Sequence, residues 1–422
     1  MLIKNVRLVD PYTNFDAVTD ILISDGKITE ISNNISSDDD EIIDGTGLTA
    51  APGLIDVHVH FRDPGFTHKE DIYTGAKAAA AGGYTTIVLM ANTNPTVDNE
   101  ETLSYIINKG KETDINIHTV ANVTMGMKGK EMTDMPYLYE KGAVGFSDDG
   151  IPIMDTELLK EAFIQAKNLN VPVSLHEEDP NLITNNGINA GEVSEVLGIG
   201  GSPKDAEITM IKRDVEIAKE TGVALDVQHI STAEGVEIIR EARKTHKNIH
   251  AEATPHHFTL TEHAVLDYGT NAKMNPPLRT EKDRLAIIKG LQDGTIEIIA
   301  TDHAPHAKEE KAREITQAPS GILGLETALP LGITELVKKN YLSINELIKK
   351  MTVGPATLYG FEDIYASVSV GRNADIVLFD ENEDFTITRF KSKSSNSPFT
   401  GRTLTGKVKY TICNGKVIYK NE

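Results

Sequence analysis

The sequence is poor in the residues that build thiolate metal sites and disulfide scaffolds. Its single cysteine is Cys413, so a disulfide framework and a zinc cluster bound by cysteines are both excluded. Any metal ion must therefore be bound by histidine, aspartate or glutamate side chains.

Basic charge and long apolar runs are also scarce. The chain has 42 Lys and Arg against 63 Asp and Glu, a net charge of -21, which argues against a nucleic-acid or anionic-membrane partner. No apolar run approaches the roughly 20 residues of a membrane span. Met1 is followed by a strand-like segment and not by the basic patch and apolar stretch of a signal peptide. We therefore expect a cytoplasmic protein that binds neither nucleic acid nor membrane.

Both ends of the chain have a pattern of short strands and hairpin turns, which the middle of the chain lacks. Residues 1–51 contain short alternating strands, two of which flank the turn residues Asp25 and Gly26. The segment from Val408 to Tyr419 likewise has two halves that meet across Asn414 and Gly415. We expect residues 1–51 and 356–422 to build one small β-sandwich domain, with residues 52–355 inserted between its two parts.

The middle of the chain alternates apolar runs with helical patterns, which is typical of parallel strands joined by crossover helices. A chain of this length has room for a barrel of about 250 to 300 residues. The expected helices cover Tyr73–Ala81, Thr156–Asn168, Ala206–Thr221, Ala233–Thr245 and Lys282–Gln292. The eight expected strands are Leu54–Phe61, Thr85–Met90, Ile115–Asn122, Ala143–Ser147, Val171–Leu175, Ala224–Gln228, Ile249–Thr254 and Ile296–Thr301. This pattern predicts an α/β fold with a TIM-type (β/α)8 barrel.

Polar side chains follow several of these strands. His58 and His60 lie two residues apart on the first strand and so point the same way, although such a pair alone is more often a half-exposed sheet face. In a TIM-type barrel, chemistry collects where the strands end. Five further polar positions sit at such ends, which predicts a metal site: Asp148, Asp149, His176, His229 and Asp302.

Five longer stretches resemble the amidohydrolase superfamily, and within it the bacterial type I dihydroorotases. They are His60-Phe61-Arg62-Asp63-Pro64-Gly65, Met90 to Thr93, Ser147 to Gly150, Lys273 to Arg279 and Ala300 to His306. The resemblance covers nearly the whole chain. It implies the reversible hydrolysis of the cyclic amide (S)-dihydroorotate to N-carbamoyl-L-aspartate in pyrimidine biosynthesis.

The resemblance also implies a set of metal ligands. His58, His60 and Asp302 would bind one zinc ion, and His176 and His229 a second, with Asp149 as the bridge. Hydantoinases, allantoinases and type II dihydroorotases have a carboxylated lysine as the bridge, whereas this chain has Ser147, Asp148 and Asp149 there. Asp148 and Asp149 are equally good ligands on their own chemistry. We expect two zinc ions, and a single ion is the alternative.

The remaining implied roles concern proton transfer and substrate binding. Asp302 would take a proton from the attacking water and return it to the leaving ring nitrogen. Arg62 offers a planar fork suited to the substrate carboxylate. The other substrate-binding residues that the resemblance implies are His60, Asn92, Asn275, His306, Ser320 and Gly321.

Two other functions fit parts of the sequence. The protein could be another cyclic amidase, such as a hydantoinase or allantoinase, or a metal-free scaffold that has kept the barrel. For a dihydroorotase we expect a homodimer that is able to associate with aspartate transcarbamoylase. Residues Ala307 to Ser320 are interpreted either as a mobile loop over the barrel mouth or as a plain solvated loop, and Lys391 to Ser397 as a polar surface stretch.

Overall fold

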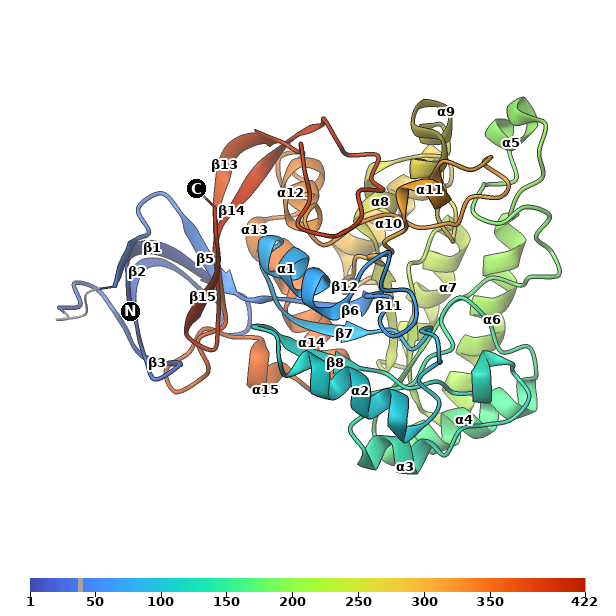
Figure 1. Ribbon diagram of the computed structural model, residues 1–422, viewed down its shortest axis with the longest axis horizontal. Coiled ribbons are helices and arrows are strands. Elements are labelled where there is room, and N and C mark those ends of the chain that lie inside the picture. Colours follow the sequence, from blue (N-terminus) through green and yellow to red (C-terminus); the bar gives the residue numbers. More distant parts are fainter. Residues whose placement is uncertain (37–40, 422) are drawn as a thin grey trace.

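Both ends of the chain join one eight-stranded sheet, which lies beside a barrel built from the middle of the chain (Figure 1). The computed structural model describes residues 1–36 and 41–421. The strand order is β15-β14-β13-β5-β1-β2-β3, with β4 beside β1. These strands are β1 (Leu2–Asp10), β2 (Phe15–Ser24), β3 (Lys27–Ser32), β4 (Ile42–Asp44), β5 (Thr49–Pro52), β13 (Ile376–Thr386), β14 (Thr403–Cys413) and β15 (Lys416–Lys420).

The two expected hairpins are present, and their tips touch. Asp25 and Gly26 join β2 to β3 with φ angles of 50° and 77°, and Asn414 and Gly415 join β14 to β15 with 49° and 77°. Two successive left-handed residues are the signature of the tight hairpin turn that Asp-Gly and Asn-Gly favour. A Cβ atom on Gly26 would lie 2.9 Å from the backbone oxygen of Asn414, so the close approach of the two turns requires glycine.

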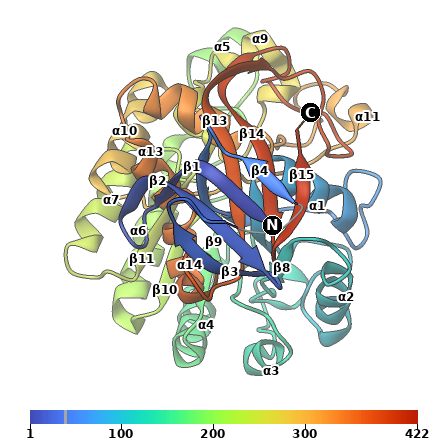
Figure 2. The ribbon, with the colours of Figure 1, turned by 90° about the vertical axis from the view of Figure 1, so that its left-hand side faces the viewer.

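The sheet curls around a core of its own, separate from that of the barrel. Figure 2 shows its blue N-terminal strands beside its red C-terminal strands. Strand β5 links the two groups because it pairs with β1 on one side and β13 on the other. The predicted β-sandwich built by both ends of the chain is thus one continuous hydrogen-bonded sheet. Its core includes Ile3, Val6, Leu8, Ile21, Ile23, Ile28, Ile376, Leu378 and Ile412.

The barrel closes as predicted, and its short fourth strand is hydrogen-bonded to the strands on both sides, for example from the Val144 amide to the Thr119 carbonyl at 3.1 Å and from the Phe146 amide to the Pro172 carbonyl at 3.1 Å. Phe146 bridges Ala121 on one side and Val173 on the other, where a strand over Ala143–Ser147 was expected. The ring closes where the His60 amide donates to the His303 carbonyl at 2.9 Å. The other strands are β6 (Leu54–Val59), β7 (Tyr84–Leu89), β8 (Asn116–Thr119), β9 (Pro172–Leu175), β10 (Ala224–Val227), β11 (Ile249–Ala253) and β12 (Ile298–Ile299).

Helices surround the barrel, and the five expected ones correspond to α1, α4, α6, α7 and α10. Among the helices formed by the described residues, none is both long and apolar enough to cross a membrane. Their bounds are α1 (Ile72–Ala81), α2 (Glu100–Gly110), α3 (Met135–Glu140), α4 (Thr156–Leu169), α5 (Glu192–Leu197), α6 (Lys204–Thr221), α7 (Ala233–Arg243), α8 (Pro255–Thr259), α9 (Ala264–Tyr268), α10 (Glu281–Asp293), α11 (Lys308–Lys311), α12 (Ala328–Gly332), α13 (Ile344–Met351), α14 (Val353–Tyr359) and α15 (Glu362–Tyr365), with shorter turns η1 (Met125–Met127), η2 (Gly269–Ala272) and η3 (Ile333–Val337).

The segment 387–402, between β13 and β14, leaves the sheet and reaches across to the barrel (Figure 1). The expectation that Lys391 to Ser397 is a surface stretch holds only in part: Lys391, Lys393 and Ser395 are exposed, but Ser392, Ser394, Asn396 and Ser397 are buried. Their hydroxyl and amide groups are hydrogen-bonded, for example Ser394 Oγ to the Lys69 carbonyl at 2.7 Å. The polar composition of these four residues therefore reflects satisfied buried contacts, not exposure to water.

Candidate active site

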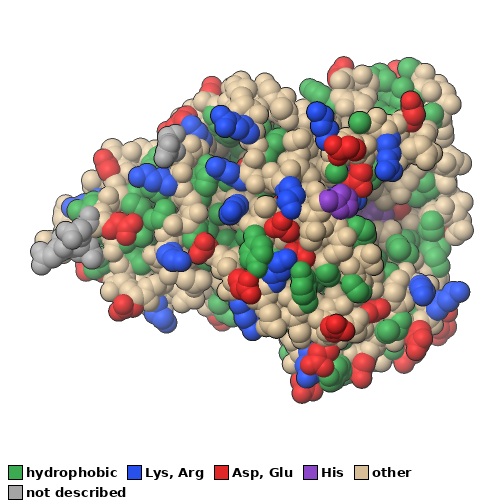
Figure 3. Space-filling model, viewed as in Figure 1, with side chains coloured by type: hydrophobic (Ala, Val, Ile, Leu, Met, Phe, Trp, Pro, Cys, Tyr) green, Lys and Arg blue, Asp and Glu red, His purple; other side chains and the backbone are tan. Residues whose placement is uncertain are grey.

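A cavity of about 250 Å³ opens where the barrel strands end. In the space-filling view of Figure 3, histidine side chains are visible in a hollow of the surface between acidic and basic side chains. All of the expected site residues line the cavity except His58, which is fully buried, and Asp148. The lining residues are His60, Arg62, Asn92, Asp149, Gly150, His176, Asn186, His229, Asn275, Asp302, Ala304, His306, Ser320 and Gly321.

Strand β6 delivers two imidazoles to one carboxylate. His58 is on β6 and His60 follows its end, so both side chains point to the same side. The Nε2 atom of His60 lies 3.0 Å from Asp302 Oδ1, and the Nε2 atom of His58 lies 3.6 Å from the same oxygen. These three ligand atoms lie within 4.8 Å of one another, which is a separation that one metal ion can span.

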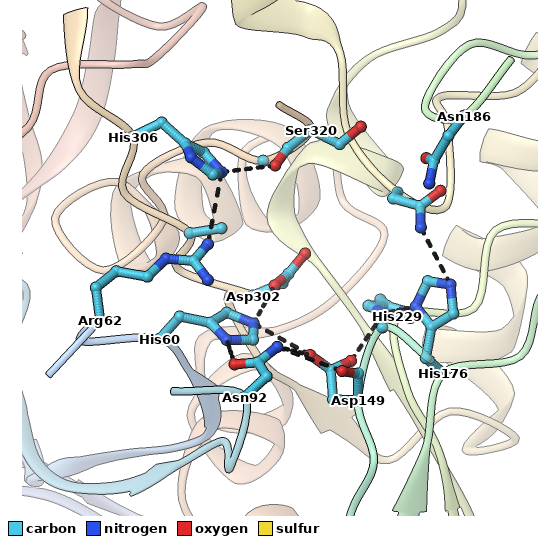
Figure 4. A pocket seen from close by; sticks show the side chains of 14 residues that line it. His60, Arg62, Asn92, Asp149, His176, Asn186, His229, Asp302, His306 and Ser320 are labelled. Atoms are coloured by element: carbon cyan, nitrogen blue, oxygen red, sulfur yellow. Dashed lines mark hydrogen bonds and ion pairs between the residues drawn. The ribbon is translucent and has the colours of Figure 1, made fainter. Parts of the chain in front are cut away.

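Asp149 lies between this group and a second pair of histidines (Figure 4). Its Oδ1 atom is 3.6 Å from His58 Nε2 and 3.8 Å from His229 Nε2, and its Oδ2 atom is 3.4 Å from His60 Nε2. His176 follows β9 and places its Nδ1 atom 3.0 Å from His229 Nε2. A carboxylate with one oxygen on each side is able to serve two ligand groups.

Asp148 faces away from the cavity. Its Oδ1 atom accepts hydrogen bonds from the backbone amides of Val123 at 2.9 Å and Thr124 at 3.2 Å, and its other oxygen accepts from the Thr124 hydroxyl. Asp148 therefore fixes the loop that follows β8. Of the two neighbouring carboxylates, Asp149 is the one that reaches the histidines.

Two outer partners orient the histidines of β6. Glu252 Oε2 lies 2.9 Å from His58 Nδ1, and Asn92 Oδ1 lies 2.9 Å from His60 Nδ1. Each acceptor holds a proton on Nδ1 and so directs Nε2 toward the carboxylates of the cavity, where it is placed to bind a metal ion. The Nε2 atom of His58 is buried and has no hydrogen-bond partner among the described residues. A divalent metal ion bound by imidazole and carboxylate groups fits this arrangement.

Glu178 is a charge partner of His176, whose Nε2 atom also lies 3.2 Å from Asn275 Nδ2. The Oε2 atom of Glu178 lies 3.3 Å from His176 Nε2, and its Oε1 atom accepts from Ser202 Oγ at 2.5 Å. Sequence reasoning missed Glu178 and Glu252 as partners of histidines. The available signal was a carboxylate within or directly after a short buried strand, where a charged side chain needs a partner.

The charges of the cluster support one another. Burial opposes ionisation of Asp149, yet His58, His60 and His176 hold its pKa well below the usual range. Burial likewise opposes protonation of His58, but Glu252 and Asp149 raise its pKa well above the usual value. Asp149 is therefore a carboxylate at neutral pH, which is the form that binds metal.

Arg62 and His306 lie on the opposite side of the cavity from His176 and His229 (Figure 4). Arg62 Nε donates to the Pro305 carbonyl at 3.3 Å, and the fork of the guanidinium faces the cavity. His306 Nε2 donates to the Ser320 carbonyl at 2.8 Å. Burial, with the positive charge of Arg62, lowers the pKa of His306, so this imidazole is neutral and Arg62 carries the positive charge.

Three of these residues have backbone conformations that are uncommon for residues with side chains. Arg62, His229 and Asp302 have φ angles of 59°, 36° and 48°. Such conformations cost about 1–3 kcal/mol each and persist where the surrounding structure holds them, often at functional sites. All three lie just after barrel strands, where the turn directs the side chain into the cavity.

Family models and full-length relatives match this chain. A family model described as dihydro-orotase-like matches residues 47–235, and one described as amidohydrolase family matches residues 319–419. A dihydroorotase of Clostridioides difficile (strain 630) is 54% identical over 420 residues, which cover 99% of each chain. A dihydroorotase of Clostridium acetobutylicum is 52% identical over 425 residues, which cover 100% of each chain.

Solved structures with the same architecture include two further cyclic amidases. An L-hydantoinase (dihydropyrimidinase) from Arthrobacter aurescens superposes with a TM-score of 0.89 at 26% identity, covering 99% of this chain and 96% of that chain. A dihydropyrimidinase from Brevibacillus agri superposes with a TM-score of 0.85 at 24% identity, covering 100% and 95%, and shows the fold alone. The predicted fold class is thereby confirmed. With full-length relatives above 50% identity, the chain belongs to the dihydroorotase family of the amidohydrolases.

Proposed function

We propose that the protein catalyses the reversible hydrolysis of (S)-dihydroorotate to N-carbamoyl-L-aspartate in pyrimidine biosynthesis. The observation that carries this proposal is that Arg62 faces the histidine and carboxylate cluster within one small cavity. The guanidinium suits the substrate carboxylate, and the cluster suits the ring carbonyl that must react. The full-length relatives named dihydroorotase support the same reaction.

We propose two zinc ions, with Asp149 as the ligand shared by both. His58, His60 and Asp302 would hold one ion, and His176 and His229 the other. Zinc, when bound, lowers the pKa of water to about 7 and polarises carbonyl oxygens. The position of Asp149 between His58 and His229, at 3.6 Å and 3.8 Å, supports its role as the bridge.

Asp302 is proposed as the group that moves the proton. Its Oδ1 atom lies on the cavity wall within 3.0 Å of His60 Nε2. It takes a proton from the attacking water and delivers it to the ring nitrogen as the amide bond breaks. The same carboxylate serves ring closure in the reverse direction.

The remaining lining groups are proposed to orient the ring. Arg62 binds the substrate carboxylate, while Asn92, Asn275 and His306 provide hydrogen bonds. Asn92 also holds His60 and donates to Asp149 Oδ2 at 3.1 Å, so it couples substrate binding to the cluster. His60 and the backbone of Ser320 and Gly321 complete the contact surface.

Metal analysis of the purified protein tests the zinc sites. We expect two equivalents of zinc, loss of dihydroorotate hydrolysis on chelation, and recovery when zinc is restored. One equivalent with full activity would leave the single-ion alternative. Purified protein without metal, inactive even after zinc is added, would favour a scaffold without catalysis.

A substrate comparison tests the specificity. Hydantoin, allantoin and dihydroorotate are assayed side by side at equal enzyme concentration, and hydrolysis of dihydroorotate should dominate. Preference for hydantoin or allantoin would instead identify another cyclic amidase.

We further propose a cytoplasmic homodimer that associates with aspartate transcarbamoylase. The proposed domain division is 1–51, 52–355 and 356–422. Light scattering on the purified protein, alone and mixed with the transcarbamoylase, checks both assemblies. A monomer that does not change in mass on mixing would contradict them.

A further inference from the structure

Asn396 belongs to the sheet-derived segment 387–402, yet it contacts the rim of the active-site cavity. Its Nδ2 group donates to the carbonyls of Ala304 at 3.0 Å and Gly321 at 3.1 Å. Its Oδ1 atom accepts from the His306 amide at 3.1 Å, and its own carbonyl accepts from the Leu323 amide at 3.0 Å. The side chain is only 4% exposed, and both of its polar atoms are used.

These bonds join two stretches that carry cavity residues. The first stretch, 304–306, ends in His306, and the second, 321–323, begins with Gly321. The segment 307–320 separates them along the chain. Asn396 therefore sets the distance between the His306 imidazole and the backbone at Gly321, together with the direct bond from the Ala304 amide to the Ile322 carbonyl at 2.8 Å.

Both the carbonyl and the amide of Gly321 are hydrogen-bonded. Its carbonyl accepts from Asn396 and from Lys311 Nζ at 3.0 Å, and its amide donates to the Lys273 carbonyl at 2.9 Å. Its φ angle is 121°, and an added Cβ would lie 2.6 Å from the Ala304 Cβ. The Gly321 carbonyl thus accepts one hydrogen bond from Lys311, which is near in the chain, and one from Asn396, which belongs to the sheet-derived segment.

The segment that carries Asn396 is itself anchored to the barrel. Lys393 Nζ lies 2.7 Å from Asp71 Oδ2, and Ser394 Oγ donates to the Lys69 carbonyl at 2.7 Å. The Lys391 amide donates to Glu326 at 2.8 Å. None of these residues lines the active-site cavity or is a proposed metal ligand, and together they hold the segment that carries Asn396 in place.

We propose that Asn396 is a positioning residue for the substrate, through which the sheet domain shapes the active site. It holds His306 and the Ser320–Gly321 backbone at the spacing that the bound ring requires. The inference rests on the proposed function, because it takes His306, Ser320 and Gly321 to contact substrate. Contacts of this kind serve ground state and transition state alike, so their loss weakens binding more than turnover.

The test compares Asn396→Ala with Ser394→Ala in the zinc-loaded full-length protein. Both variants remove a buried hydrogen bond of the same segment, but only the first touches the cavity rim. We expect Asn396→Ala to raise KM for dihydroorotate about tenfold with kcat within about twofold. Zinc content should be unchanged, and Ser394→Ala should keep the wild-type KM. Asn396→Asp, which is isosteric and keeps the acceptor for the His306 amide, should raise KM as well and serves if the alanine variant does not fold.

Three results would overturn the inference: an unchanged KM, a fall in kcat alone, or an equal effect of Ser394→Ala. Arg62→Met, assayed in parallel, separates this failure from that of the proposed function. If Arg62→Met raises KM and the Asn396 variants do not, only the role of Asn396 is lost. If Arg62→Met has no effect either, the proposed substrate site is wrong.

Discussion

Histidines occupy two regions of this molecule with opposite chemistry. In the cavity, His58 lies between Glu252 and Asp149, whose carboxylates raise its pKa. At the contact between β8 and α15, the ring of His118 packs 4.6 Å from that of Phe361, and burial lowers its pKa to about 4. The same residue type is thus kept close to carboxylates in one place and held as a neutral packing element in the other.

The two rings differ most in their neighbours, although His58 is fully buried and His118 only partly buried. Carboxylates fix the orientation of His58 and leave its Nε2 atom facing other ligands. His118 has a tyrosine hydroxyl instead, with its Nε2 atom 3.2 Å from the Tyr365 oxygen. A buried histidine therefore signals a metal site only where carboxylates and other histidines converge on it.

The largest effect is expected from Asp302→Asn, which removes the proposed proton carrier of the cavity. Turnover should fall by about 10³-fold, the usual scale for loss of general acid–base catalysis. The melting temperature should change little, since the barrel core is untouched. Steady-state kinetics and thermal melts measure both, and a variant with near wild-type kcat would remove Asp302 from this role.

His118→Phe tests the second region, where a neutral histidine is expected to make stability depend on pH. The pKa of about 4, below the ordinary 6.5, means that the contribution of neutral His118 to stability is complete above pH 6.5 and is lost as the pH falls toward 4. The full loss is about 3 kcal/mol by proton linkage. Urea unfolding at pH 7, 5 and 4 should show a shallower pH dependence in the variant than in the wild type. Parallel curves for the two proteins would contradict the assignment.

Arg62→Met removes the cation of the cavity while keeping a long side chain. We expect KM for dihydroorotate to rise about 50-fold, on the scale of a lost charge-assisted contact, with bound zinc unchanged. Kinetics together with metal analysis check this. Unchanged kinetics would place the substrate carboxylate elsewhere.

Glu252→Gln makes the surroundings of His58 more like those of His118. The amide still accepts from His58 Nδ1, but the negative charge is lost, so zinc affinity should fall about tenfold. Competition with a chromogenic chelator gives the affinity. If the affinity stays at the wild-type value, the charge of Glu252 has no part in metal binding.

Most of the fold could be predicted because each barrel strand has a recognisable pattern within its own few residues. Apolar runs ended by polar residues predicted seven strands close to their observed bounds. The fourth is short, but the amides of Val144, Phe146 and Ser147 donate to the neighbouring strands within the expected range. The hairpin turns were recognisable for the same reason, because two adjacent residues, Asp-Gly or Asn-Gly, are enough to favour a tight turn.

The site was predictable where direction follows from strand periodicity, as for His58 and His60. Asp148 and Asp149 are chemically equal, and the loop after β8 decides between them by hydrogen-bonding the first. Asn396 was hidden because its partners lie far away in the chain, and a polar stretch looks exposed until its neighbours are known. Long-range contacts of this kind leave no local pattern.

The pairing of β5 with both β1 and β13 has a consequence for biosynthesis. Ile3, Val6 and Leu8 emerge from the ribosome early, but their partners on β13 and β14 follow only after the entire barrel has been made. The nascent N-terminal strands must therefore wait with an uncovered apolar face and unpaired edges, a condition that invites aggregation. Synthesis speed and chaperone access over the barrel region thus bear directly on the yield of folded protein.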